Sequence, residues 1–163
     1  MKAASIVEIK KELEYLDKEK IKQLCLRLAR FKLENKELLT YLVFEAHDEV
    51  SYVQSIKNQL DGLFSEINTN SYFYVKKSVR KILRRVKKFS RYSNCLETEV
   101  ELLLYVWQKM KNINPSIFLN ITLTNLYNRQ LASVQKKILK LSQKNKYFYV
   151  TLVVNTNLEQ QML

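Results

Sequence analysis

Hydrophobic residues recur at intervals of three and four along most of the chain, the spacing that aligns them on one face of an α-helix. The first two apolar stripes are Ile6, Ile9, Leu13 and Leu16, and then Ile21, Leu24, Cys25, Leu28 and Phe31. The third set, whose broad apolar coverage predicts central burial, is Leu38, Leu39, Leu42 and Val43. The same spacing continues through several further segments, so we expect about seven to eight helices.

Polar residues that favour helix starts separate these segments. Side-chain oxygens at such positions accept hydrogen bonds from the first backbone N–H groups of a helix, which have no partner within it. The candidate caps are Asp17, Asn35, Asp48, and either Asn70 or Ser71. Asn114-Pro115 predicts a further start, because proline at the first helical position loses no needed hydrogen bond. The run Tyr92-Ser93-Asn94 predicts a break between two helices.

Composition supports a helical fold. The 163 residues include one glycine, Gly62, and one proline, Pro115, whereas average usage would give about eleven and eight. Tight β-turns and glycine-rich phosphate loops need more of these residues, so both are improbable here. We therefore predict an all-α fold, an irregular multi-helix bundle or helical array. No fixed repeat distinguishes these two architectures.

The domain organisation follows from the same pattern. We predict a single helical domain over residues 1–146, with a sub-boundary near residues 68–71, where a polar run interrupts the periodicity. Residues 147–154 are rich in β-branched and aromatic side chains, which favour a strand over a helix. We therefore expect a β-prone or disordered tail over residues 147–163. A helix end maintained by packing, an edge strand and a sticky terminus stay equally open for it.

Positive charge is concentrated in one short stretch. The net charge of the chain is +12, and residues 71–92 contribute nine basic and no acidic side chains to it. An α-helix turns by 100° per residue, so a helix over this stretch places its apolar residues in one arc and its basic residues in the opposite arc. The predicted anion-binding residues are Lys76, Lys77, Arg80, Lys81, Arg84, Arg85, Lys87, Lys88 and Arg91. Like charges four residues apart destabilise an isolated helix, so this arrangement favours a negatively charged partner.

Phosphates of RNA or DNA are the partner that the pattern favours most, and their binding would weaken steeply with salt. Aromatic residues that flank the basic residues could stack on unpaired nucleobases. They are Tyr72, Phe73, Tyr74 and Tyr92. An acidic protein partner and an anionic lipid surface remain alternatives. A fourth interpretation is a solvated surface neutralised within the molecule. The acids that could neutralise it are Glu97, Glu99 and Glu101, or Glu45, Asp48 and Glu49.

No motif indicates catalysis. His47 is the one histidine, and Cys25 and Cys95 lie far apart in the sequence, so no metal-ligand spacing is present. We expect a non-enzymatic protein with no catalytic residues, no metal site and no cofactor. The two cysteines are predicted to be reduced core or near-core thiols. The start of the chain does not resemble a signal peptide and no apolar run is long enough to span a bilayer, so we expect a cytoplasmic protein without integral membrane association. The pattern does not indicate an oligomeric state.

Overall fold

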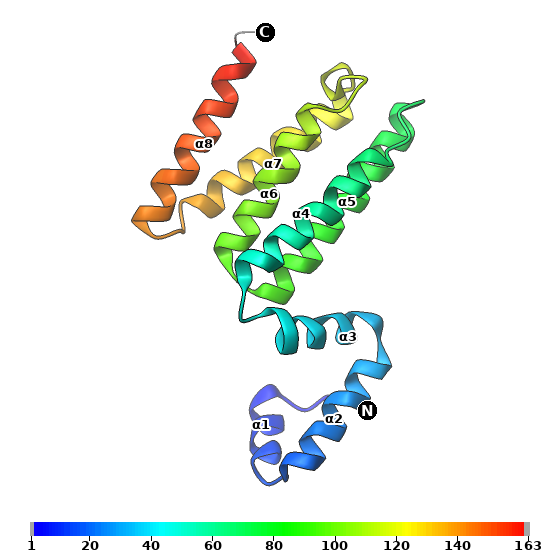
Figure 1. Ribbon diagram of the computed structural model, residues 1–163, viewed down its shortest axis with the longest axis vertical. Coiled ribbons are helices and arrows are strands. Elements are labelled where there is room, and N and C mark those ends of the chain that lie inside the picture. The colour runs from blue at the N-terminus through cyan, green and yellow to red at the C-terminus, as the bar shows by residue number, and fades with distance from the viewer. Residues whose placement is uncertain (1, 162–163) are drawn as a thin grey trace. The chain divides into compact units, whose positions relative to one another are not determined.

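The computed structural model describes residues 2–161, and the side-chain surroundings of all of these except Lys144 and residues 155–161. Every regular element in this range is helical, which confirms the all-α prediction (Figure 1). The elements are α1 (Ile6–Glu14), α2 (Lys18–Phe31), α3 (Leu33–Thr40), the π-helical turn η1 (Tyr41–Glu45), α4 (Glu49–Ser65), α5 (Tyr72–Ser93), α6 (Leu96–Lys111), the 3-10 turn η2 (Ile117–Leu119), α7 (Ile121–Ile138) and α8 (Gln143–Gln161).

The chain divides between Ala46 and His47 into two compact units. We call residues 2–46 the N-terminal unit and residues 47–161 the C-terminal unit, and describe each by itself. The sub-boundary expected near residues 68–71 falls in the connection between α4 and α5, inside the C-terminal unit.

Local hydrogen bonds define the helix ends of the N-terminal unit. The Asp17 carboxylate accepts the backbone N–H of Lys20 at 2.7 Å, which confirms the predicted cap of α2. The predicted cap at Asn35 is wrong, because α3 already begins at Leu33. Asn35 instead donates its side-chain amide to the Leu28 carbonyl at 2.9 Å, near the end of α2, where carbonyls lack partners within the helix.

The apolar stripes of the N-terminal unit are largely uncovered. None of α1, α2 and α3 contains a buried residue. Central burial of the third helix was predicted wrongly, because Leu42 and Val43 are exposed on η1 and only Tyr41 beside them is buried. Cys25 is exposed as well, so its prediction as a core thiol is also wrong. The periodicity predicted the helices and their apolar faces but did not reveal that these faces stay largely exposed.

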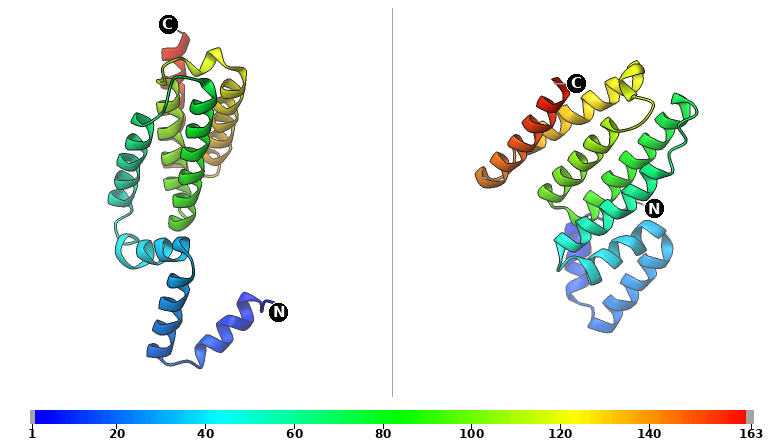
Figure 2. Two further views of the ribbon diagram at one scale, coloured as in Figure 1. Left: turned by 90° about the vertical axis from the view of Figure 1, so that its right-hand side faces the viewer. Right: turned by 45° about the horizontal axis from the view of Figure 1, so that its top comes forward.

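In the C-terminal unit, the helices from α4 to α7 lie alongside one another and alternate in direction (Figure 2). α5 packs against α4 and α6, and α6 also packs against α4 and α7. The core includes Trp107, whose ring stacks on that of Tyr127 with 5.2 Å between centroids. Burial of this kind is the main source of stability in a domain of this size.

Three of the predicted helix signals in the C-terminal unit are confirmed and one is wrong. The side chains of Asp48 and Ser71 cap α4 and α5, by accepting the backbone N–H groups of Ser51 and Phe73. α5 ends before Asn94, whose φ of 53° is the left-handed conformation that asparagine tolerates at helix ends. Pro115 does not begin a long helix: η2 follows it, and α7 begins at Ile121, where the Asn120 side chain accepts the Leu123 N–H.

The expectation of a β-prone or disordered tail over residues 147–163 is wrong for the part that the structure describes, because this part belongs to α8; of the three alternatives left open for it, the helix maintained by packing is the one observed. Tyr149 and Val153 lie four residues apart and are both buried, and α8 packs against α7. The Tyr149 hydroxyl also donates to Glu101 at 3.5 Å. Burial of one helical face thus outweighs the strand preference of the individual residues, which is weak and depends on context. Residues 162 and 163 lie outside the described range.

Candidate functional site

The helix that carries the basic cluster has one buried and one charged face. Its buried residues include Val75, Val79, Ile82, Val86 and Phe89, which confirms the predicted apolar face. Because α5 packs between α4 and α6 through this face, its opposite face is held on a fixed scaffold. A ligand on that face would meet side chains whose backbone is already ordered.

All nine predicted basic residues lie on α5. Six are exposed, namely Lys77, Arg80, Lys81, Arg84, Lys87 and Arg91, and the half-buried ones are Lys76, Arg85 and Lys88. Within the described part of the chain, eight of the nine take part in no ion pair; these are Lys76, Lys77, Arg80, Lys81, Arg84, Arg85, Lys87 and Arg91. The ninth, Lys88, lies 5.2 Å from the centre of the Phe89 ring.

The acids of α6 that could neutralise this face contact other groups. Glu101 pairs with Lys57 at 2.6 Å, and Glu99 pairs with Lys137 at 2.8 Å. Glu97 accepts hydrogen bonds from its own backbone N–H and from the Cys95 thiol, which hold the pKa of this carboxyl below its usual range. These contacts draw the acids of α6 towards groups outside α5.

The acids near α4 behave differently from one another. Asp48 caps α4 through the Ser51 N–H at 3.0 Å. Glu49 does contact α5, because its carboxylate accepts a hydrogen bond from the hydroxyl of Ser93 at the C-terminal end of that helix. It also accepts a hydrogen bond from the hydroxyl of Thr98 at 2.5 Å. These contacts lie at the start of α4, at the end of α5 and at the start of α6. Glu45 belongs to the N-terminal unit.

Two of the four flanking aromatic residues are exposed. Phe73 and Tyr74 retain 64% and 46% of their accessible surface, and their rings meet edge to face at 5.5 Å. Tyr72 instead donates its hydroxyl to the Ser116 carbonyl at 3.0 Å, and Tyr92 is buried. The sequence could not separate these roles, because all four rings flank the same cluster.

A depression of about 430 Å³ lies on the first half of the basic face. Its lining residues are Phe73, Lys76, Lys77, Arg80 and Arg84. It thus combines one exposed aromatic ring with four cations and no acid. Cations attract phosphates, and an exposed ring offers a surface on which an unpaired nucleobase can stack.

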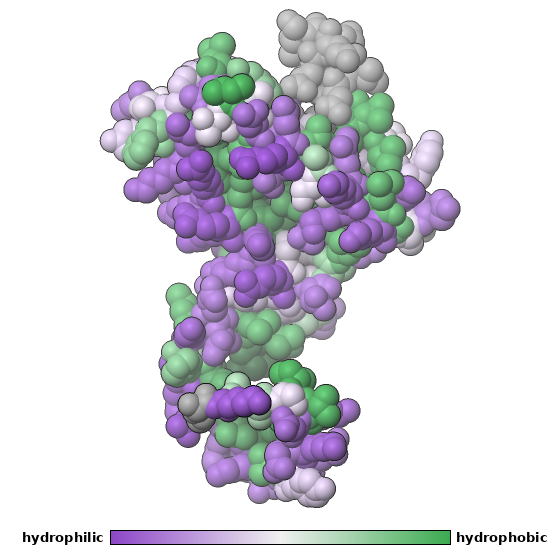
Figure 3. All heavy atoms as spheres, turned by 180° about the vertical axis from the view of Figure 1, so that it is seen from behind, coloured by the Kyte–Doolittle hydropathy of each residue, from purple (hydrophilic) through white to green (hydrophobic). Residues whose placement is uncertain are grey.

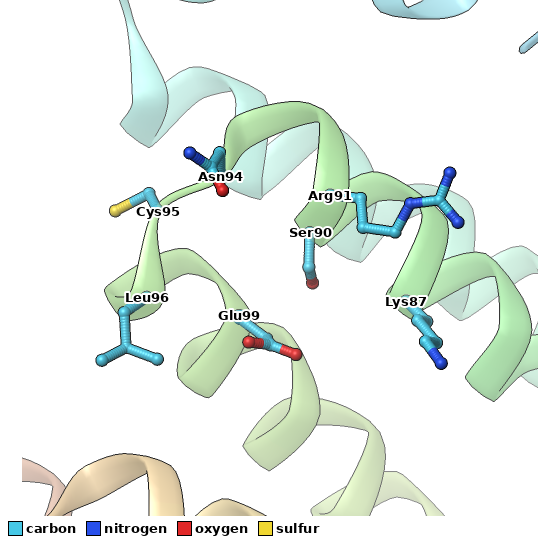
Figure 4. Close-up of a pocket in the computed structure, with 7 residues that line it drawn as sticks. All are labelled: Lys87, Ser90, Arg91, Asn94, Cys95, Leu96 and Glu99. Carbon is cyan, nitrogen blue, oxygen red and sulfur yellow. The ribbon is translucent and has the colours of Figure 1, made fainter. Parts of the chain in front are cut away.

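A second pocket of about 270 Å³ lies at the other end of α5 (Figure 4). Its lining residues are Lys87, Ser90, Arg91, Asn94, Cys95, Leu96 and Glu99. Figure 4 shows the Ser90 hydroxyl and the Glu99 carboxylate directed into the same hollow, and Ser90 Oγ is buried without a hydrogen-bond partner among the described residues. Because Glu99 places negative charge inside this pocket, the depression beside Phe73 suits a phosphate better.

Other chemistry is sparse in the described residues. No group of three or more His, Cys, Asp or Glu side chains is placed to hold a metal ion there, and His47 is exposed. Cys25 and Cys95 are both free thiols, and Cys95 is half-buried. Between residues 2 and 161, no helix has both the length and the apolar character that crossing a bilayer requires.

Fold and surface together define an all-α protein with a cationic helix face. No family model, curated protein or solved structure matches this chain. The surface of α5 is therefore the basis for assigning a function.

Proposed function

We propose that the basic face of α5 binds the phosphates of RNA or DNA, largely without regard to base sequence. The observation that carries this proposal is the depression beside Phe73, where four cations without ion pairs in the described part of the chain adjoin an exposed ring. Nucleic acids present closely spaced phosphates, and a row of Lys and Arg that replaces their counterions gains affinity from counterion release.

Single-stranded nucleic acid is the preferred form. Proteins that bind single strands combine a positively charged surface with aromatic side chains on which bases stack, and such stacking contributes about 1–3 kcal/mol per base. Phe73 is exposed next to Lys76 and Lys77, so a base can reach the ring while its phosphate meets the cations. We expect the aromatic contribution to be lost in Phe73→Ala.

The test is a fluorescence-polarisation titration of the full chain with a fluorescently labelled single-stranded oligonucleotide at several salt concentrations. If about five cations engage phosphates, the logarithm of affinity should fall against the logarithm of salt with a slope of about −3.5. Absence of binding at low salt would refute the proposal.

A charge-reversal pair locates the binding surface. Arg80→Glu/Arg84→Glu should weaken binding at least about tenfold and flatten the salt slope by about one to two, because two phosphate contacts become repulsive. The matched control is Lys136→Glu/Lys140→Glu. It reverses the charge of two exposed basic residues at the same spacing, near the end of α7. Equal losses in the two variants would show that net charge alone, not this face, determines binding.

A further inference from the structure

The N-terminal unit exposes an unusual amount of apolar surface. Ile6, Phe31 and Leu33 retain 80%, 76% and 71% of their accessible surface. Figure 3 shows apolar side chains at the surface of this unit, interleaved with polar ones. Large exposed apolar patches usually mark sites of interaction.

Part of this surface forms a groove of about 660 Å³ between α2, α3 and η1. Its lining residues are Leu26, Ala29, Arg30, Lys32, Leu33, Lys36, Leu39, Thr40, Val43 and Phe44. Six of the ten are apolar, three are cations and none is acidic. In the described residues no ion pair involves Arg30, Lys32 or Lys36. Such a groove fits an amphipathic helix that has an apolar stripe and acidic flanks.

The helix α1 has these properties. At 100° per residue, Ile6, Ile9 and Leu13 fall within about 60° of one another, while Glu12 and Glu14 lie on opposite sides of this stripe. Neither carboxylate takes part in an ion pair within the described range. A capping box between Ser5 and Glu8 defines the start of α1, yet an isolated helix of nine residues is unstable in water unless it packs against something.

The α1 of the same chain does not occupy the groove. No residue of α1 lines it. Along α2, the groove residues Leu26 and Ala29 lie on average about 140° round the helix from the stripe of Ile21, Leu24 and Leu28. α1 is tethered to the first residue of α2 by a short turn, whereas the groove begins two turns further along and extends to η1. The α1 of another copy has no such restriction.

We propose that two copies of this chain associate through their N-terminal units, with α1 of each copy seated in the groove of the other. The reciprocal exchange gives a closed twofold interface, the commonest symmetry of protein oligomers. The apolar stripe of α1 provides the anchors, and Glu12 and Glu14 meet the cations at the rim of the groove. These contacts offset the repulsion that a net charge of +12 on each copy produces.

The primary test is the molar mass of the full, nuclease-treated chain by light scattering over a range of concentrations. The expected result is a concentration-dependent rise from 19.5 kDa to twice that value. A mass that stays at 19.5 kDa up to about 100 µM would overturn the proposal.

Exposed apolar residues allow the interface to be located without disturbing a core. Ile6→Asp and Phe44→Asp should each raise the dissociation constant at least about tenfold, because each places a charge in an apolar contact. Ile6 and Phe44 are 80% and 68% exposed, so we expect the helical circular dichroism to stay unchanged. The control is Val50→Asp, at an 81% exposed position of the C-terminal unit. Dimers that resist both variants, or that the control dissociates equally, would contradict the proposed interface.

A charge-swap experiment tests the pairing itself. Glu12→Lys/Glu14→Lys and Arg30→Glu/Lys36→Glu should each give monomers, because each homodimer would then place like charges in both grooves. Mixing the two variants should restore a dimer, because both grooves of the mixed pair contain opposite charges. A mixture that remains monomeric would refute the pairing. If Arg80→Glu/Arg84→Glu dimerises as strongly as the wild type, association does not depend on nucleic acid.

Discussion

The two units of this protein use the same helical periodicity in different ways. In the C-terminal unit, apolar stripes such as that of α5 are buried against neighbouring helices. In the N-terminal unit, equally regular stripes on α1 and α2 contain no buried residue. An amphipathic pattern thus predicts a helix and its apolar face, but whether the covering surface belongs to the same unit depends on tertiary structure.

The largest expected difference comes from a matched pair of leucines. Leu60→Ala, at a fully buried position of α4, should lower the free energy of unfolding by about 2–5 kcal/mol, because it removes apolar contacts and leaves a cavity. Leu28→Ala, at a 61% exposed position of α2, should change it by less than about 0.5 kcal/mol at concentrations where the chain is monomeric. Urea unfolding followed by circular dichroism measures both. Equal effects would mean that the two units do not differ as described.

A smaller difference should separate two buried tyrosines within the C-terminal unit. Tyr52→Phe removes a hydrogen bond of 3.1 Å to the Phe89 carbonyl and should lower stability by about 1 kcal/mol. Tyr127→Phe should be neutral or stabilising, because the Tyr127 hydroxyl is buried without a partner among the described residues. The same burial raises the pKa of Tyr127 to about 12. Comparison of the two variants by thermal unfolding tests this order, and a larger loss for Tyr127→Phe would contradict it.

Gly62→Ala should have a modest effect of the opposite sign. Gly62 lies within α4, and a methyl group added to it would meet nothing within 4 Å apart from its chain neighbours and the nearby backbone of α4 itself. Alanine has a helix propensity higher than that of glycine by about 1 kcal/mol, so the variant should be stabilised by about 0.5–1 kcal/mol. A decrease in the midpoint of urea unfolding would show that α4 does not continue through this position.

The smallest effect on stability is expected at the ion pair between Asp61 and Lys109, where 2.8 Å separates Asp61 Oδ1 from Lys109 Nζ. Hydrogen bonds from Lys109 and then from Tyr105 hold the pKa of Asp61 below its ordinary value of 3.8. The stabilisation is therefore present above that ordinary pKa and disappears as pH falls through the lowered pKa of the folded state. Because the pair is partly exposed, Asp61→Asn should lower stability by only about 0.2–1 kcal/mol at pH 7.

Unfolding curves of Asp61→Asn and the wild type at several pH values provide the measurement. The two proteins should converge as pH falls below the folded pKa, because Asp61 is then uncharged. A difference that grows towards acid pH would show that this carboxylate is not stabilised by Lys109.

Local features were predictable from the sequence. The caps at Asp17, Asp48 and Ser71 depend on neighbours within a few residues, and the two faces of α5 follow from its period. The location of the basic residues on one exposed face could therefore be predicted, although their role in binding stays a prediction. The exposure of Phe73 could not, because the neighbouring Tyr72 is equally aromatic and becomes half-buried through its bond to Ser116.

Features that depend on distant contacts were not predictable. Residues 147–154 have the composition of a strand, yet they form part of α8, where Tyr149 and Val153 are buried. Asn35 is a residue type that often caps helices, yet its side chain donates a hydrogen bond to the Leu28 carbonyl of the preceding helix instead of capping α3. The groove of the N-terminal unit was missed for the same reason. Its walls come from α2, α3 and η1, so it depends on how these elements pack together.

The length of α5 also limits the size of any polyanion that it can engage in full. From Lys76 to Arg91 the helix rises about 22 Å, at 1.5 Å per residue. A single strand that keeps the spacing of about 3.4 Å per nucleotide found in a duplex would cover this distance with about six nucleotides. Oligonucleotides shorter than this would leave part of the basic row unoccupied, and longer ones would accommodate several molecules in succession.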